Sequence, residues 1–207
     1  MPESESFNRG ARMMRNAPTT ASGTSTGANL ALLKIDTLER AVFMWGSRHR
    51  DTETMSIQIT LADFTDPRLG VFVQAHLDDL APTAPVESQH ALHLEALQLP
   101  TIRLFVAYEN SDIVGTAALA CLDPAHEEIK SMRTDPARRG RGIASRMLDH
   151  LFADARERAI RRVSLETGSM DYFAPARALY VGAGFKPCPP FGGYTNDPNS
   201  AFMTLLL

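Results

Sequence analysis

The chain has 207 residues, enough for one well-buried domain and short for two. Its 44% hydrophobic and 22% charged residues are typical of a soluble globular protein, and its net charge of -3 argues against a nucleic-acid binder that works through a basic surface. Two cysteines, Cys121 and Cys188, exclude a disulfide framework and a cysteine zinc cluster. Since neither a membrane span nor a signal peptide is recognisable, we expect a cytoplasmic protein with no membrane or nucleic-acid partner.

The first part of the chain differs in amino-acid composition from the rest. The run "NAPTTASGTSTGAN" at 16–29 is rich in Ser, Thr, Gly and Ala and offers nothing to bury. A regular pattern of apolar residues begins only at Met55. We therefore expect residues 1–54 to be a flexible, poorly ordered N-terminal leader, or Met55 to be the true start, and residues 55–207 to form the compact domain.

The first half of this domain predicts a strand, two helices and a hairpin. Alternation predicts a strand at 56–60, and a helix at 67–80 is predicted from the spacing of Leu69, Phe72, Val73, His76, Leu77 and Leu80. A second helix is expected at 86–99, before the stop at Pro100. Two apolar runs joined by "NS" then predict antiparallel strands, at 102–109 and 112–122.

The second half alternates strands and helices. A strand at 127–134 leads through a glycine turn into an amphipathic helix whose apolar face carries Ile143, Met147, Leu148, Leu151 and Ala155. A strand, a helix that ends at a glycine, and a last strand follow, at 162–167, 174–184 and 200–206. The predicted order is strand, two helices, three strands, helix, strand, helix, strand. This order indicates a mixed α/β layered domain with one crossover helix between the fourth and fifth strands.

The glycine turn reads Arg139-Gly140-Arg141-Gly142. Glycines between a strand and the first turn of a helix let several backbone N–H groups converge on one anion, such as a diphosphate. A tight helix-start turn with solvated arginines is the alternative. A nucleoside-triphosphatase loop is excluded because no Lys-Ser/Thr follows the glycines, and no Gly-x-Gly-x-x-Gly unit opens a doubly wound sheet.

Two segments together resemble the GNAT superfamily of acyl-CoA N-acyltransferases. "SMRTDPARRGRGIA" is similar to the family's acyl-CoA-binding segment, and "ARALYVGAGF" is similar to its second signature, Ala-x-x-Leu-Tyr-x-x-x-Gly-Phe. "EIKSMRT", "SLETGS", "PFGGY" and "DPNSAFM" further resemble a bacterial branch of small enzymes whose acceptors are mostly unassigned. The resemblance covers most of 55–207 and implies a GNAT-type mixed, splayed β-sheet flanked by helices.

This resemblance implies acetyl-CoA as cosubstrate. The strand at Met132, Arg133 and Thr134 would bond its backbone to the pantetheine arm. The pyrophosphate would lie against backbone amides of seven consecutive residues: Arg139, Gly140, Arg141, Gly142, Ile143, Ala144 and Ser145. The side chains of Arg138, Arg139 and Arg141 would add positive charge there, or would be solvated loop arginines.

The transfer requires a deprotonated amine, a polarised thioester carbonyl and a proton for the departing thiolate. Tyr180 matches the family tyrosine that protonates the cofactor sulfur, and its alternative role is packing at the edge of the core. Glu166, at the end of its strand, is the candidate base. Glu128 on the neighbouring strand competes with it, unless it is a solvent-facing strand residue.

Several further residues modify this assignment. Phe173 stands where many family members place an asparagine that contacts pantetheine, so the loop "TGSMDYF" is expected to shape the acceptor pocket instead. His76, His90, His93 and His126 complete no zinc-protease pattern, so we do not expect a metal there. Cys121 lies in an apolar strand and is expected to be a buried, inert thiol.

The expected function is acetyl-CoA-dependent N-acetylation of a primary amine, on a small molecule, by direct attack in a ternary complex. Two alternatives stay open: a catalytically silent acyl-CoA-binding or regulatory domain, and an acetyltransferase that acts on protein amines. Neither the acceptor nor a homodimer is decided by the sequence.

Overall fold

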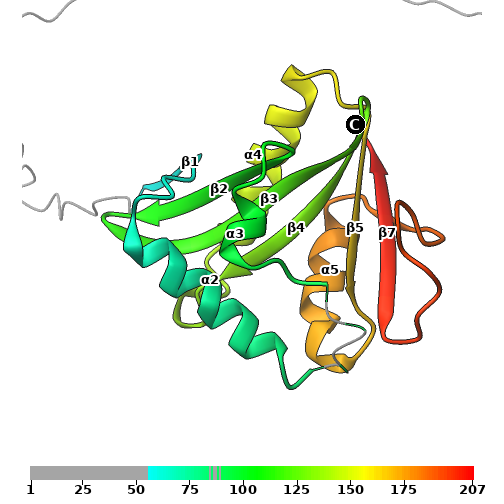
Figure 1. The fold of residues 1–207 in the computed structure, drawn as a ribbon, viewed down its shortest axis with the longest axis horizontal. Coiled ribbons are helices and arrows are strands. Elements are labelled where there is room, and N and C mark those ends of the chain that lie inside the picture. The colour runs from blue at the N-terminus through cyan, green and yellow to red at the C-terminus, as the bar shows by residue number, and fades with distance from the viewer. Residues whose placement is uncertain (1–55, 84, 86–87, 89) are drawn as a thin grey trace, which may run out of the picture. The chain divides into compact units, whose positions relative to one another are not determined.

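The computed structural model describes residues 56–83, 85, 88 and 90–207. The leader that we expect at residues 1–54 lies outside the described residues. The described part of the chain forms a seven-stranded sheet flanked by helices, in the order β1-β2-β3-β4-β5-β7-β6 (Figure 1). The strands are β1 (Ile57–Leu61), β2 (Ile102–Glu109), β3 (Asp112–Asp123), β4 (His126–Thr134), β5 (Arg162–Gly168), β6 (Lys186–Pro187) and β7 (Ser200–Leu206).

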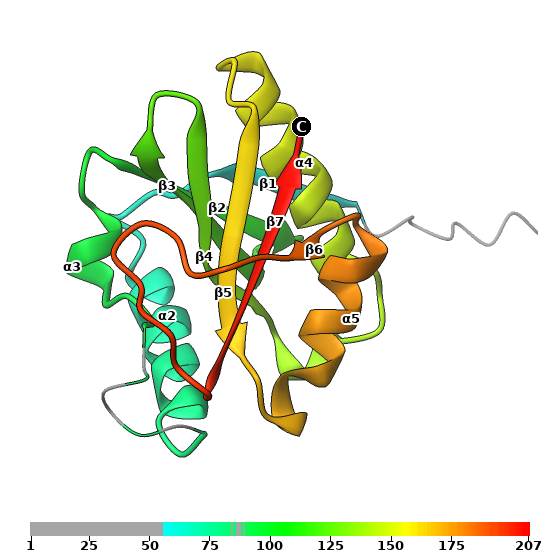
Figure 2. The ribbon, with the colours of Figure 1, turned by 90° about the vertical axis from the view of Figure 1, so that its right-hand side faces the viewer.

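Helices cover both faces of the sheet (Figure 2). Alternate side chains of β2 enter two separate cores: Phe105 and Ala107 belong to the core under α4 (Ile143–Glu157) and α5 (Ala174–Gly182). Leu104 and Val106 belong to the core under α2 (Pro67–Leu80) and α3 (Leu94–Leu97). Because successive strand residues point to opposite faces, a strand buried on both faces is apolar nearly throughout, as β2 and β3 are.

The predicted order of elements and the mixed, splayed fold class are confirmed. Helix α4 connects β4 to β5, and these two strands pair in parallel. Their other neighbours, β3 beside β4 and β7 beside β5, pair antiparallel with them. The second helix, expected over 86–99, is a single turn over Leu94–Leu97, preceded by an extended His93. The longer helix was predicted from the spacing of three between Ala91, Leu94 and Leu97. In the structure only Leu94 and Leu97 lie in the helix, and only Leu97 is buried there. The structure also adds β6, which pairs with β7 over two residues.

The sheet splits between β4 and β5. The two strands are paired from His126 opposite Arg162 to Ile129 opposite Leu165, and then each continues without the other (Figure 1). Ser131, in the separated part of β4, has a φ of 50°, and the register between β3 and β4 shifts at the same place. A bulge of this kind bends its strand and increases its twist. The bulge therefore separates β4 from β5 and leaves one edge of β4 open to a ligand.

Candidate functional site

Two cavities lie beside the split in the sheet, one of about 460 Å³ and one of about 150 Å³. Among the described residues, six line both cavities: His76, Leu80, Met132, Phe173, Ala176 and Tyr180. The two cavities therefore share a wall, which we call the junction. Two substrates bound one in each cavity would meet there.

The larger cavity runs along the end of β4 and onto the first turn of α4. Nine of the ten residues predicted to hold the cofactor line it: Met132, Arg133, Thr134, Arg139, Gly140, Gly142, Ile143, Ala144 and Ser145. The tenth, Arg141, does not, because its guanidinium turns away to bind Glu109 at the end of β2. The strand edge and the glycine turn thus lie on one continuous surface, as the sequence motif predicts.

The backbone of the glycine turn explains why glycines stand there. Gly140 and Gly142 both have a φ of 76°, a left-handed conformation that side chains with a Cβ rarely adopt. Gly142 is the N-cap of α4, and the first helical bond runs from the Arg146 N–H to its carbonyl, 3.1 Å away. The N–H groups of residues 143–145 consequently have no partner inside the helix. Together with the positive end of the helix dipole, they suit a diphosphate.

The arginines of this turn differ in their partners. Arg141 donates to the two carboxylate oxygens of the buried Glu109, at 3.0 and 2.5 Å. Arg138 binds Asp135, Glu109 and Asp112. Arg139 is exposed, lines the larger cavity and has no carboxylate partner within the described part of the chain. Arg139 is therefore the arginine of the turn whose charge is free for an anion, while Arg138 and Arg141 hold the turn against β2 and β3.

Tyr180 of α5 lies at the junction. Its ring is buried in the core beside Phe185, 5.7 Å between centroids, and its hydroxyl donates to the Met132 sulfur at 3.4 Å. A thioether is a weak acceptor, so this bond is easily exchanged for a better one. Burial raises the pKa of the Tyr180 phenol above its usual value, which keeps the hydroxyl protonated as a donor.

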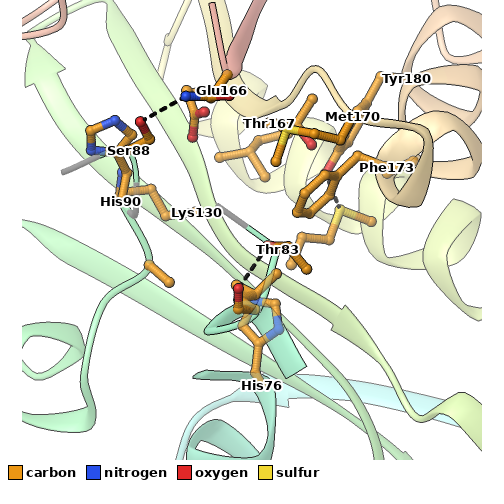
Figure 3. Close-up of a pocket in the computed structure, with 17 residues that line it drawn as sticks. His76, Thr83, Ser88, His90, Lys130, Glu166, Thr167, Met170, Phe173 and Tyr180 are labelled. Carbon is orange, nitrogen blue, oxygen red and sulfur yellow. Dashed lines mark hydrogen bonds between the residues drawn. The ribbon is translucent and has the colours of Figure 1, made fainter. Parts of the chain in front are cut away.

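Glu166, near the end of β5, lines the smaller cavity but not the junction. Burial raises the pKa of its carboxyl, because the charged form is poorly solvated there. Figure 3 shows Glu166 on the same side of this cavity as Ser88, His90 and Lys130, with Tyr180 on the other side.

The competing carboxylate, Glu128, is not the solvent-facing residue that we considered. It is buried, and it accepts hydrogen bonds from the Lys130 Nζ at 3.0 Å and from the Tyr194 hydroxyl at 2.6 Å. It lines neither cavity. Its position next to β5 in the middle of the sheet explains the burial, and its two partners leave Glu166 as the carboxylate that faces the smaller cavity.

The loop "TGSMDYF" forms part of the smaller cavity, which Thr167, Gly168, Met170 and Phe173 all line. The Phe173 ring lies directly on Gly168, where an added Cβ would come within 2.1 Å of the Phe173 Cδ2. Any larger residue at 168 would push the ring away. Gly168 thus lets an aromatic ring stand at the junction, in the place where an asparagine was expected from the resemblance.

In the sequence, His76 was placed in the spacing pattern of the predicted helix and was otherwise tested only as a metal ligand. The structure places it on α2 at the junction, where it lines both cavities; Figure 3 shows it in the lining of the smaller one. Burial, reinforced by the nearby guanidinium of Arg133, lowers its pKa to about 4. The sequence signal for this position is its place on the apolar face of the helix, three residues after Val73.

Of the remaining histidines, His90 lines the smaller cavity, whereas His93 and His126 line neither cavity. Within the described ranges, no cluster of three or more His, Cys, Asp or Glu side chains could hold a metal ion. Cys121 is exposed, so the expectation of a buried thiol is wrong: the last residues of β3 extend beyond the core, and the apolar run there gave no sign of it. No helix in the described part of the chain is long and apolar enough to cross a membrane.

Comparisons with known proteins show which family the chain is similar to. A family model described as "Acetyltransferase (GNAT) family" matches residues 72–185. The Bacillus subtilis (strain 168) protein named uncharacterized N-acetyltransferase YsnE is 44% identical over 148 residues, 72% of this chain and 98% of that protein. The Escherichia coli (strain K12) protein named uncharacterized N-acetyltransferase YedL is 39% identical over 145 residues, 70% and 91% of the two chains. A crystal structure from Klebsiella pneumoniae, described as an inferred acyl-CoA N-acyltransferase, has a TM-score of 0.62 at 29% identity and covers 74% of this chain and 99% of that one.

Proposed function

Because the chain belongs to the GNAT acetyltransferase family, and so is an N-acetyltransferase, we propose that it moves an acetyl group from acetyl-CoA to the primary amine of a small molecule. The observation that carries this proposal is the pair of cavities with a shared wall. One has the strand edge and helix terminus that suit a thioester with a diphosphate tail. The other is small, carries Ser88, His90, Lys130 and Glu166 among its lining residues, and ends at the same wall.

We assign the larger cavity to acetyl-CoA. The open edge of β4 at Met132, Arg133 and Thr134 would bond the amide groups of the pantetheine arm. The free amides at the start of α4 and the backbone of residues 139–142 would hold the diphosphate, with Arg139 adding the charge that is not already paired. Acetyl-CoA bound in this way would supply an activated acyl carbon, because the CoA thiolate is a good leaving group.

The smaller cavity is assigned to the acceptor amine. An amine with a pKa near about 10 is mostly protonated at neutral pH and must lose a proton before it attacks. Glu166 is the residue proposed to take that proton, through water where it does not reach the nitrogen directly, because its carboxyl faces this cavity and has a raised pKa. A new C–N bond then forms as the C–S bond breaks, and the nitrogen loses its second proton to water, from which Tyr180 can regain a proton that it gives to the sulfur. Tyr180 donates its hydroxyl proton, or a hydrogen bond, to the departing sulfur.

A cavity of about 150 Å³ favours a small acceptor over a protein segment, which would need a groove along the surface. The protein-amine alternative therefore rests on no feature of the described residues. A silent acyl-CoA-binding domain would need the same larger cavity, so that alternative is distinguished by experiment.

Thiol release from acetyl-CoA in the presence of a pooled library of small amines tests the proposal. We expect release that depends on both substrates, with acetylated products identified by mass. Peptides with free N-termini and lysines form a second pool. Tight acetyl-CoA binding with no thiol release from either pool would establish the silent alternative, and release from the peptide pool alone would establish a protein acceptor.

A further inference from the structure

The junction between the two cavities is lined mainly by side chains that form no strong hydrogen bonds. Of the six residues that line both cavities, Leu80, Met132, Phe173 and Ala176 have no strong hydrogen-bonding group in their side chains. His76 and Tyr180 are the two that do. A reaction at this wall needs one group for the nitrogen that attacks and one for the sulfur that leaves. Tyr180 is assigned to the sulfur, which leaves His76 for the nitrogen.

The position of His76 is fixed by its neighbours. The Arg133 Nη1 donates to the backbone carbonyl of Ala75 at 3.0 Å and to the Asp79 carboxylate at 2.7 Å, on either side of His76 in α2. The Arg133 guanidinium also lies over the Phe72 ring, 5.3 Å from its centroid. Arg133 itself belongs to the open edge of β4. The helix that carries His76 is therefore tied to the strand that lines the larger cavity.

The imidazole of His76 has no hydrogen-bond partner among the described residues. With its pKa lowered to about 4, it is neutral over the working range of most enzymes, so one ring nitrogen is a donor and the other an acceptor. Both are free for a ligand in the cavities. Glu166, by contrast, lines only the smaller cavity and does not reach the shared wall.

We propose that His76 is a catalytic residue that accepts a hydrogen bond from the attacking amine at the junction. One N–H of the deprotonated amine would bind the unprotonated ring nitrogen, which turns the nitrogen lone pair toward the acyl carbon. The proton removed before the attack goes to Glu166 or to water, and the second proton, which the nitrogen loses as the amide forms, goes to water, so His76 needs no charge of its own. This inference rests on the proposed function of the two cavities.

The test compares His76→Leu and His76→Gln with the parent protein, with an amine that the library screen identifies. Leucine removes the acceptor, and glutamine restores one in its side-chain carbonyl. We expect His76→Leu to lower kcat/KM for the amine by about 10- to 100-fold, as expected for a positioned hydrogen bond, and His76→Gln to recover part of it. Acetyl-CoA affinity should stay within about twofold in both variants. His93→Leu, at an exposed histidine that lines neither cavity, is the matched control and should keep parent activity.

A packing role for His76 would produce another result. Equal losses in His76→Leu and His76→Gln, together with a lower Tm, would overturn the proposal, and so would parent activity in His76→Leu. The ring nitrogens of His76 can also be observed directly by nitrogen NMR in the protein saturated with CoA, before and after the amine is added. A shift of the His76 acceptor nitrogen on amine binding is expected, and its absence with the amine bound would overturn the proposal. If no amine is acetylated at all, the proposed function fails, whereas acetylation without any dependence on His76 refutes this inference alone.

Discussion

Replacing Tyr180 by phenylalanine separates binding of the cofactor from help to its leaving group. The change removes one hydroxyl, whose partner in the structure is the Met132 sulfur at 3.4 Å, and keeps the ring against Phe185. Because a sulfur acceptor is weak, the free energy of unfolding should fall by no more than about 1 kcal/mol. Acetyl-CoA affinity should be unchanged, since the strand edge and the glycine turn are untouched.

The catalytic loss can be worked out from the contact that the hydroxyl would make. A hydrogen bond to a charged group contributes about 1.5–3 kcal/mol, which corresponds to about a 10- to 160-fold change in rate. Burial raises the pKa of the Tyr180 phenol, whereas a free thiol has a pKa of about 8.5, so complete proton transfer to the thiolate is uphill. We therefore expect kcat to fall within that range and not by the larger factors of a strong general acid.

The assay is thiol release at saturating acetyl-CoA and amine, from about pH 6 to about pH 10, with acetyl-CoA affinity from calorimetry and Tm beside it. Tyr108→Phe is the matched control, because Tyr108 packs beside the core under α2 and lines neither cavity. A Tyr180→Phe variant that turns over at the parent rate across this range would refute the reasoning. Tyr180 would then be a packing residue, and the proton would come from water or another side chain.

Three further outcomes are expected. Gly142→Glu should abolish acetyl-CoA binding, because it places an anion at the start of α4 and forces a side chain into a φ of 76°; unchanged affinity in a folded variant would contradict the assignment of the turn to the diphosphate. Arg139→Ala should weaken acetyl-CoA binding more than Arg141→Ala, since Arg141 is already paired with Glu109, and the opposite order in calorimetry would count against that distinction. A protein that begins at Met55 should keep both Tm and acetyl-CoA affinity, and a large loss of either would show that residues 1–54 take part in the domain.

The fold was largely predictable because hydrophobic periodicity reports burial directly. Helix α2 has the bounds predicted from the spacing of its apolar residues, Pro67–Leu80, with Asp66 as its N-cap and Pro67 in its first turn. The hairpin of β2 and β3 was predicted from two apolar runs and a two-residue turn at Asn110 and Ser111. The second helix was overestimated, because three apolar residues at a spacing of three fit several turns of helix or a single one.

The site was predictable where it is made of backbone and not where it depends on side-chain direction. Glycines at 140 and 142 require a backbone conformation, so the turn could be read from the sequence. Whether Arg141 faces the cavity or Glu109, and whether Glu128 faces solvent or Lys130, depends on partners distant in the sequence. The junction itself has no local signal, because α2, β4 and α5 meet there only in the folded protein.

The bulge in β4 links these features into one arrangement. It ends the pairing of β4 with β5 after Ile129, so the backbone of residues 132–134 is left at an open edge before the chain turns into α4. The same stretch carries Arg133, whose guanidinium ties α2 to the strand. A ligand that bonds to the edge of β4 therefore lies against the wall on which α2 presents His76. On the proposed assignment of the two cavities, acetyl-CoA would bind along β4, and α2, which is tied to the same strand, would position the acceptor. This arrangement favours the proposed direct attack between two bound substrates.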